Sequence, residues 1–75
     1  MKINYDAEVD ALYIEFRPLK KGQAETRPLS DDAIANYGPD GKLAGLEVLD
    51  ASVVLGKAFE KVIVEVSPIK RKVVA

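Results

Sequence analysis

The sequence has no cysteine, no histidine and no tryptophan among its 75 residues. Without cysteine there are no disulfides and no thiolate nucleophiles, and without histidine there is no imidazole base or nitrogen ligand for zinc. The hydroxyl groups of Ser30, Ser52 and Ser67 therefore lack the base that activates the nucleophile of a serine hydrolase. We expect a protein without catalytic activity, bound metal or other cofactor.

An excess of charge of one sign and long apolar runs are also missing. Eleven basic residues against twelve acidic residues give a net charge of -1, so the chain as a whole has no positive field to attract nucleic acid. No apolar run approaches the roughly 20 residues that a membrane-spanning helix needs, and the N-terminus lacks the apolar region of a signal peptide. We expect a soluble, cytoplasmic protein with no membrane partner.

The chain is nevertheless apolar enough to fold, because 48% of its residues are hydrophobic. A domain of 75 residues is near the size at which burial only just outweighs the conformational entropy lost on folding, so association with a partner would help it. We expect one domain over residues 1–67 and a basic and apolar tail over residues 68–75.

The clearest local pattern is the turn sequence Gly-Pro-Asp-Gly at residues 38–41. Proline presets φ at the second position of a tight turn, and glycine tolerates the positive φ with which such loops often close. This pattern predicts a β-hairpin between residues 33–37 and 42–49. Alternating apolar residues at 3–5 and 12–16 predict a second antiparallel pair of strands around the acidic loop at 6–10.

Residues 23–29 alternate weakly, and Pro28 cannot donate a hydrogen bond to a neighbouring strand, so any strand here lies at a sheet edge. Apolar residues at three- and four-residue spacings predict a short helix over residues 51–60, with Asp50 or Ser52 as its cap. The β-branched run at residues 61–66 favours a strand, and continuation of the helix is the alternative.

Together these patterns predict an α+β fold. We expect a small antiparallel sheet of four to five strands, arranged as a meander of hairpins, with one short C-terminal helix packed on one face.

The loop at residues 6–10 places three carboxylates, Asp6, Glu8 and Asp10, at alternate positions, as the start of a calcium loop does. The match then fails, because a calcium loop of the EF-hand type needs glycine at its sixth position and glutamate at its twelfth. This chain has Ala11 and Arg17 there. A solvated acidic turn explains the three carboxylates better than a metal site or a carboxylate-based enzyme.

The interaction residues that the sequence suggests lie in the C-terminal tail. Lys70, Arg71 and Lys72 form a basic triplet that offers contacts to phosphate, although a short basic run near a chain end is more often a solubilising tail. Val73 and Val74 follow and offer apolar contacts. A nucleic-acid-associated protein that uses this tail is therefore one alternative function.

Two stretches of the chain together resemble the small prokaryotic domain-of-unknown-function 2283 family. Residues 5–14 read Tyr-Asp-Ala-Glu-Val-Asp-Ala-Leu-Tyr-Ile, and residues 37–52 end in Leu-Asp-Ala-Ser. The departure is Gly-Pro at residues 38–39, where members more often carry acidic residues. The resemblance implies a compact cytoplasmic protein with no established enzyme activity, and gene neighbourhoods of some relatives suggest an antitoxin-like role.

Three functions remain after this reading. The first is a protein-binding module, antitoxin-like in its narrower form, that associates with itself as a dimer or with a small protein partner through a sheet edge or the apolar C-terminal segment. The second is the nucleic-acid-associated protein, and the third is the carboxylate-based metal site or enzyme.

Overall fold

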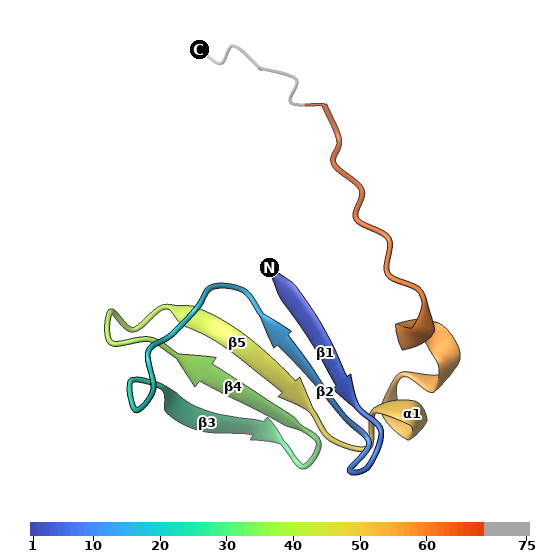
Figure 1. The fold of residues 1–75 in the computed structure, drawn as a ribbon, viewed down its shortest axis with the longest axis horizontal. Coiled ribbons are helices and arrows are strands. Elements are labelled where there is room, and N and C mark those ends of the chain that lie inside the picture. Colours follow the sequence, from blue (N-terminus) through green and yellow to red (C-terminus); the bar gives the residue numbers. More distant parts are fainter. Residues whose placement is uncertain (69–75) are drawn as a thin grey trace.

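The computed structural model describes residues 1–68, which form one antiparallel sheet followed by two helical turns (Figure 1). The strands are β1 (Lys2–Asp6), β2 (Ala11–Glu15), β3 (Glu25–Ser30), β4 (Ala33–Tyr37) and β5 (Leu43–Val48). The α-helix α1 (Ala51–Val54) and the 3₁₀-helix η1 (Gly56–Glu60) follow. The expected α+β class with an antiparallel sheet is confirmed, and the sheet has five strands where four to five were expected.

The strands lie in the order β1-β2-β5-β4-β3. The pairs β1–β2, β3–β4 and β4–β5 are antiparallel hairpins, but the expected meander is wrong at one connection. β2 pairs with β5 instead of β3, and residues 16–24 carry the chain to the far edge of the sheet (Figure 1). This order sets Leu12 opposite Val48 and Ile14 opposite Leu46, so apolar side chains meet on one face.

β3 is an edge strand, as its proline indicates. Pro28 lies opposite Ile34 of β4, and the register shifts between Pro28 and Ser30. A strand that cannot donate every backbone hydrogen bond is tolerated where it has one neighbour only. β1 is the other edge, and all five of its residues are exposed.

The turn at residues 38–41 joins β4 to β5 as predicted. The Gly41 N–H donates to the Gly38 carbonyl at 2.9 Å, and the Gly38 N–H donates to the Lys42 carbonyl at 2.9 Å. Gly41 has a φ of 79°, a left-handed conformation that glycine adopts without steric cost. The predicted hairpin therefore forms around the expected turn.

The single helix expected over residues 51–60 is wrong, because α1 ends at Val54 and η1 begins at Gly56. Gly56 has a φ of 62°, which is outside the right-handed helical region and interrupts the helix. The β-branched residues Val53 and Val54 give little local helix propensity to oppose this break. The expected cap is also wrong in detail, since the side chain of Asp50 makes no capping hydrogen bond.

The strand expected over residues 61–66 does not form in the described chain, and neither does a continuation of the helix. Lys61 has extended backbone angles, φ −133° and ψ 122°, and the segment then leaves the sheet (Figure 1). A β-strand needs a neighbour to satisfy its backbone groups, and nothing in residues 1–68 pairs with this segment. The pattern is typical of a strand, but the partner is missing.

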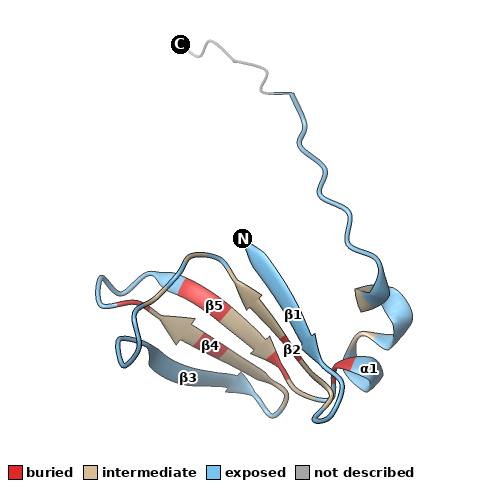
Figure 2. Ribbon diagram, in the orientation of Figure 1, coloured by how far each residue is buried: buried red, intermediate tan, exposed pale blue. Residues whose placement is uncertain are grey.

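Few side chains are fully buried within residues 1–68 (Figure 2). The buried hydrophobic residues are Leu12, Ala35, Ala44, Val48 and Ala51. Leu12, Val48 and Ala51 form one cluster, against which Leu55 and Phe59 pack. No helix within residues 1–68 is long and apolar enough to cross a membrane.

On the opposite face of the sheet, the ring of Tyr13 lies over Gly45. A Cβ atom at Gly45 would lie 2.7 Å from Cζ of Tyr13 and 3.1 Å from the carbonyl oxygen of Ile14. Both distances are shorter than a normal contact, so any larger residue at 45 would push the tyrosine away. Glycine within this strand therefore leaves room for an aromatic ring.

Candidate functional site

An apolar groove lies between the β1–β2 end of the sheet and the helical turns. Its volume is about 340 Å³. The strands contribute Ile3, Leu12 and Ile14, and the helical turns contribute Leu55, Ala58 and Phe59. Residues 61–63 complete the lining, in which Lys61 is the one charged residue. The groove therefore offers apolar surface and hardly any polar group that would orient a polar ligand.

The aromatic rings of Tyr5 and Phe59 are in contact at one end of the groove. Their ring centroids are 4.5 Å apart, with an angle of 40° between the planes. Such tilted aromatic pairs contribute roughly 0.5–1.5 kcal/mol beyond the burial of their area. The contact fixes η1 beside β1, which positions the residues that follow η1.

A polar cluster centred on Asp10 attaches the start of α1 to the β1–β2 loop. The backbone N–H of Ser52 donates to Oδ1 of Asp10 at 3.0 Å, and the Ser52 hydroxyl donates to Oδ2 at 2.6 Å. The Tyr5 hydroxyl donates to Oδ1 at 2.7 Å, and the N–H of Ala51 donates to the Asp10 carbonyl at 2.9 Å. Asp10 therefore caps α1 from a loop that is distant in the sequence.

These hydrogen bonds shift the pKa values of both ionisable partners. The bonds from Ser52 and then from Tyr5 lower the pKa of Asp10, because they stabilise its charged carboxylate. The bond to Asp10 raises the pKa of Tyr5, because it holds the phenol in its neutral, donating form. The cluster attaches the start of α1 to the β1–β2 loop.

The three carboxylates of the acidic loop, which suggested a metal site as an alternative, do not converge on one point within residues 1–68. Oδ1 of Asp6 accepts the Glu8 backbone N–H at 3.0 Å, and Asp10 is engaged with α1. No group of three potential ligands converges anywhere in residues 1–68. The side chains of Asp6 and Asp10 shape the loop and anchor the helix.

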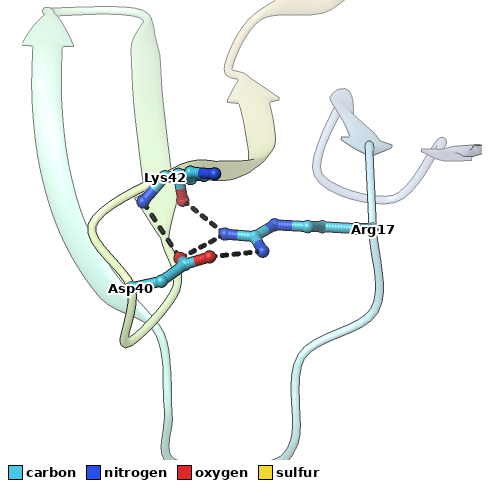
Figure 3. Close-up of polar contacts among 3 residues, drawn as sticks. All are labelled: Arg17, Asp40 and Lys42. Carbon is cyan, nitrogen blue, oxygen red and sulfur yellow. Dashed lines mark hydrogen bonds and ion pairs between the residues drawn. The ribbon is translucent and has the colours of Figure 1, made fainter.

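A second polar cluster joins the connection after β2 to the β4–β5 turn (Figure 3). Nη1 and Nη2 of Arg17 donate to the two carboxylate oxygens of Asp40 at 2.8 and 2.5 Å, and Nη2 also donates to the Lys42 carbonyl at 3.0 Å. The Arg17 guanidinium holds the pKa of Asp40 well below its usual range, and Asp40 raises the pKa of Arg17. The opposite charges of Arg17 and Asp40 pair with each other, so this cluster links the connection after β2 to the β4–β5 turn.

The five residues named as interaction candidates lie outside the described residues, namely Lys70, Arg71, Lys72, Val73 and Val74. What the structure does place is the apolar stretch that precedes them. Val62, Val64 and Val66 are exposed, Val66 to 84% of its surface. Of these three valines, Val62 lines the groove.

Sequence reasoning missed both the groove and the role of Asp10. Asp10 and Ser52 are 42 positions apart, so no local pattern relates them. The available signal was that each belongs to one of the two stretches that carry the family resemblance. The groove depends on Gly56, because the break there turns η1 toward Tyr5.

A comparison with protein-family models matched most of the chain. The model described as "Protein of unknown function (DUF2283)" matches residues 2–52. Searches of curated proteins and of solved structures found no significant match. The matched range contains all five strands and both residues that join the β1–β2 loop to α1.

Proposed function

We propose that this chain, which belongs to the DUF2283 family of proteins of unknown function, is a protein-binding module without catalytic activity. The observation that carries the proposal is the apolar groove beside the uncovered outer edge of β1. An edge strand offers backbone donors and acceptors to an extended peptide, and an adjacent groove accepts its alternate side chains. Both features lie at the same end of this molecule.

The lining of the groove favours a protein partner over a small polar ligand. A volume of about 340 Å³ is at the lower end of small-molecule sites, which add a few convergent polar groups to orient their ligand. Here the side chains of Ile3, Ile14 and Phe59 offer none, and Lys61 is the single charge. Apolar side chains of a partner segment match this surface.

In this proposal, α1 and η1 cover the β1–β2 face of the sheet and form one side of the groove. The packing of Leu55 and Phe59 against the cluster of Leu12, Val48 and Ala51 supports this placement. In its narrower form the module is cytoplasmic and antitoxin-like, with a small protein as partner. The family resemblance alone supports that form.

A capture experiment with two matched variants tests the function. Ala58→Glu places a charge in the groove, whereas Val53→Glu adds the same charge on α1 at a position that is 81% exposed and does not line the groove. We expect the tagged wild type and Val53→Glu to recover one stoichiometric protein from the host. Ala58→Glu should recover at least tenfold less, because a charge is costly in an apolar contact.

Mass spectrometry identifies the recovered protein, and calorimetry with the purified pair measures its affinity for each variant. An untagged copy of the chain itself is scored separately from other recovered proteins. Equal recovery by Ala58→Glu and Val53→Glu, or recovery of no protein by the wild type, would overturn the proposal. Circular dichroism of both variants shows that the comparison is made between folded proteins.

A further inference from the structure

Residues 61–66, which we call segment 61–66, have the properties of a strand without a neighbour. The sequence Lys-Val-Ile-Val-Glu-Val alternates valines at 62, 64 and 66, and Lys61 already has extended backbone angles. All six residues are exposed, and no strand of residues 1–68 pairs with them. Exposed, unpaired, β-branched segments of this kind readily add to a sheet.

The outer edge of β1 offers the matching half of such a pair. β1 is hydrogen-bonded to β2 on one side only, so its other side presents free backbone groups. Ile3 and Tyr5 of β1 point to the apolar face, because they lie opposite Ile14 and Leu12 of β2. A strand added to this edge would need apolar residues on the same face.

One antiparallel register meets this need with the apolar residues of segment 61–66. If Val64 lies opposite Ile3, then Val62 lies opposite Tyr5, and all four side chains share the face that carries the groove. Cross-strand pairs of aromatic and β-branched residues stabilise sheets. The added valines would continue the apolar surface of β1 and β2 outward.

The same register also matches the charges on the opposite face. Glu65 then lies opposite Lys2, and Lys61 lies opposite Asp6, so both ends of the pairing carry residues of opposite charge. A shift by two residues in either direction loses both pairs. The parallel arrangement over the same residues sets Lys61 against Lys2 and Glu65 against Asp6, which is repulsive at both ends.

The described chain does not form this pairing within itself. The ring of Phe59 contacts the ring of Tyr5, and η1 ends one residue later, at Glu60. In the described chain Phe59 keeps this contact while all six residues of segment 61–66 stay exposed and outside the sheet.

We infer that segment 61–66 of one copy adds to the outer edge of β1 of a second copy, and that the two copies exchange these strands reciprocally. Reciprocal exchange gives a closed, symmetric dimer, because each copy offers one edge and one strand. After residues 61–63, which line the groove, the segment runs away from the body of its own sheet in Figure 1, and this leaves it accessible for such an exchange. This inference rests on the proposed protein-binding function and names the partner.

Sedimentation of the full chain across a range of concentrations tests the dimer. We expect the wild type to form a dimer and Val64→Asp to be monomeric at concentrations at which the wild type is dimeric, because the new charge would face Ile3. Val53→Asp adds the same charge elsewhere and should leave the dimer unchanged. A monomeric wild type at all concentrations, or a dimer that Val64→Asp leaves intact, would overturn the inference.

Substitutions that reverse the charge at position 2 or 65 test the register and the antiparallel direction of the proposed strand pairing. Each of Lys2→Glu and Glu65→Lys should weaken the homodimer about tenfold, since each creates a like-charge pair at both interfaces. Lys21→Glu, in the exposed connection after β2, is the control for net charge and should have no such effect. An equimolar mixture of Lys2→Glu and Glu65→Lys should restore dimerisation, because in the heterodimer both pairs again have opposite charge.

Failure of the mixture to restore dimers would overturn the inference. Recovery of stability by a monomeric Lys2→Glu/Glu65→Lys double variant would assign the pairing to a single chain and would also overturn it. Neither result bears on the capture of another protein, which depends on Ala58. A monomeric chain that still captures a partner in the Ala58-dependent manner would leave the proposed function standing and remove only the second copy.

Discussion

At the scale of single residues, Asp10 connects the most distant parts of the described chain. It has a left-handed φ of 52°, which an aspartate tolerates better than most residues. This conformation lets its carbonyl and its carboxylate both face the start of α1, where they accept three hydrogen bonds from Ala51 and Ser52. One residue, through its carbonyl and its carboxylate, thus replaces the local side-chain cap that α1 lacks.

Asp10→Asn should destabilise the fold and reduce its sensitivity to acid. Asparagine tolerates the left-handed backbone, but its amide group can no longer accept both bonds from Ser52. Because the folded protein lowers the pKa of Asp10, the stabilisation is present above about pH 4 and is lost as the pH falls through the folded pKa. We expect a melting temperature several degrees lower at pH 7 and a smaller further decrease below pH 4 than in the wild type.

Thermal unfolding between pH 7 and pH 2.5 measures this difference. Asp31→Asn is the matched control, because Asp31 is exposed and makes no side-chain hydrogen bond in residues 1–68. Some acid sensitivity should remain in Asp10→Asn, since the lowered pKa of Asp40 acts in the same direction. Identical pH profiles for Asp10→Asn and the wild type would show that the cap contributes nothing.

At the scale of elements, Gly56 decides how the chain leaves α1. Its positive φ ends the α-helix and directs η1 back toward the sheet, where Phe59 meets Tyr5. A continuous helix over the same residues would point its apolar side chains elsewhere. The shape of the groove therefore depends on one backbone conformation.

Gly56→Ala should destabilise the protein by about 1 kcal/mol, because an L-residue in the left-handed conformation is strained. Gly56→Asn should cost less, since asparagine adopts that conformation more readily. No atom of the fold would contact the new Cβ, so crowding does not contribute to either variant. Urea unfolding of the two variants measures the difference, and equal stabilities would show that Gly56 does not need its positive φ.

The elements also differ in how well the sequence predicts them. The turn at residues 38–41 and the edge position of Pro28 follow from local chemistry, and both predictions were correct. The pairing of β2 with β5 joins Leu12 to Val48 and depends on which distant surfaces bury each other. The same holds for the cap from Asp10, and no local pattern contains that information.

The strand predicted over residues 61–66 shows a different limit. Its β-branched alternation is a real preference of the sequence, but a preference becomes a strand only when a neighbour supplies hydrogen bonds. Within residues 1–68 no strand pairs with residues 61–66. In the exchange that we infer, this neighbour belongs to a second copy, which a prediction from one chain does not include.

At the scale of the whole molecule, the small core sets the stability. Leu12 is only 6% exposed and is the largest of the five buried hydrophobic side chains. Leu12→Ala should cost roughly 2–5 kcal/mol. A chain of this length has a total stability of roughly 4–11 kcal/mol, so one truncation removes a large share of it.

Equilibrium unfolding in urea measures this loss, with Val53→Ala as the exposed aliphatic control. We expect the midpoint of Leu12→Ala to fall sharply and that of Val53→Ala to stay within error of the wild type. A small effect at Leu12 would place the stabilising contacts outside the cluster with Val48 and Ala51. Parallel measurements at one fixed concentration keep any effect of association constant.

The strand order also determines when the sheet can be completed during synthesis. β2 leaves the ribosome early, but its inner edge pairs with β5, the last strand of the sheet to be made. At ordinary rates of translation, that edge waits roughly two to seven seconds for a partner some thirty residues further along the chain. During this interval both edges of the nascent β1–β2 hairpin are unpaired. The central strand β5 joins this hairpin to β4 and β3, so the five-stranded sheet forms only after β5 emerges.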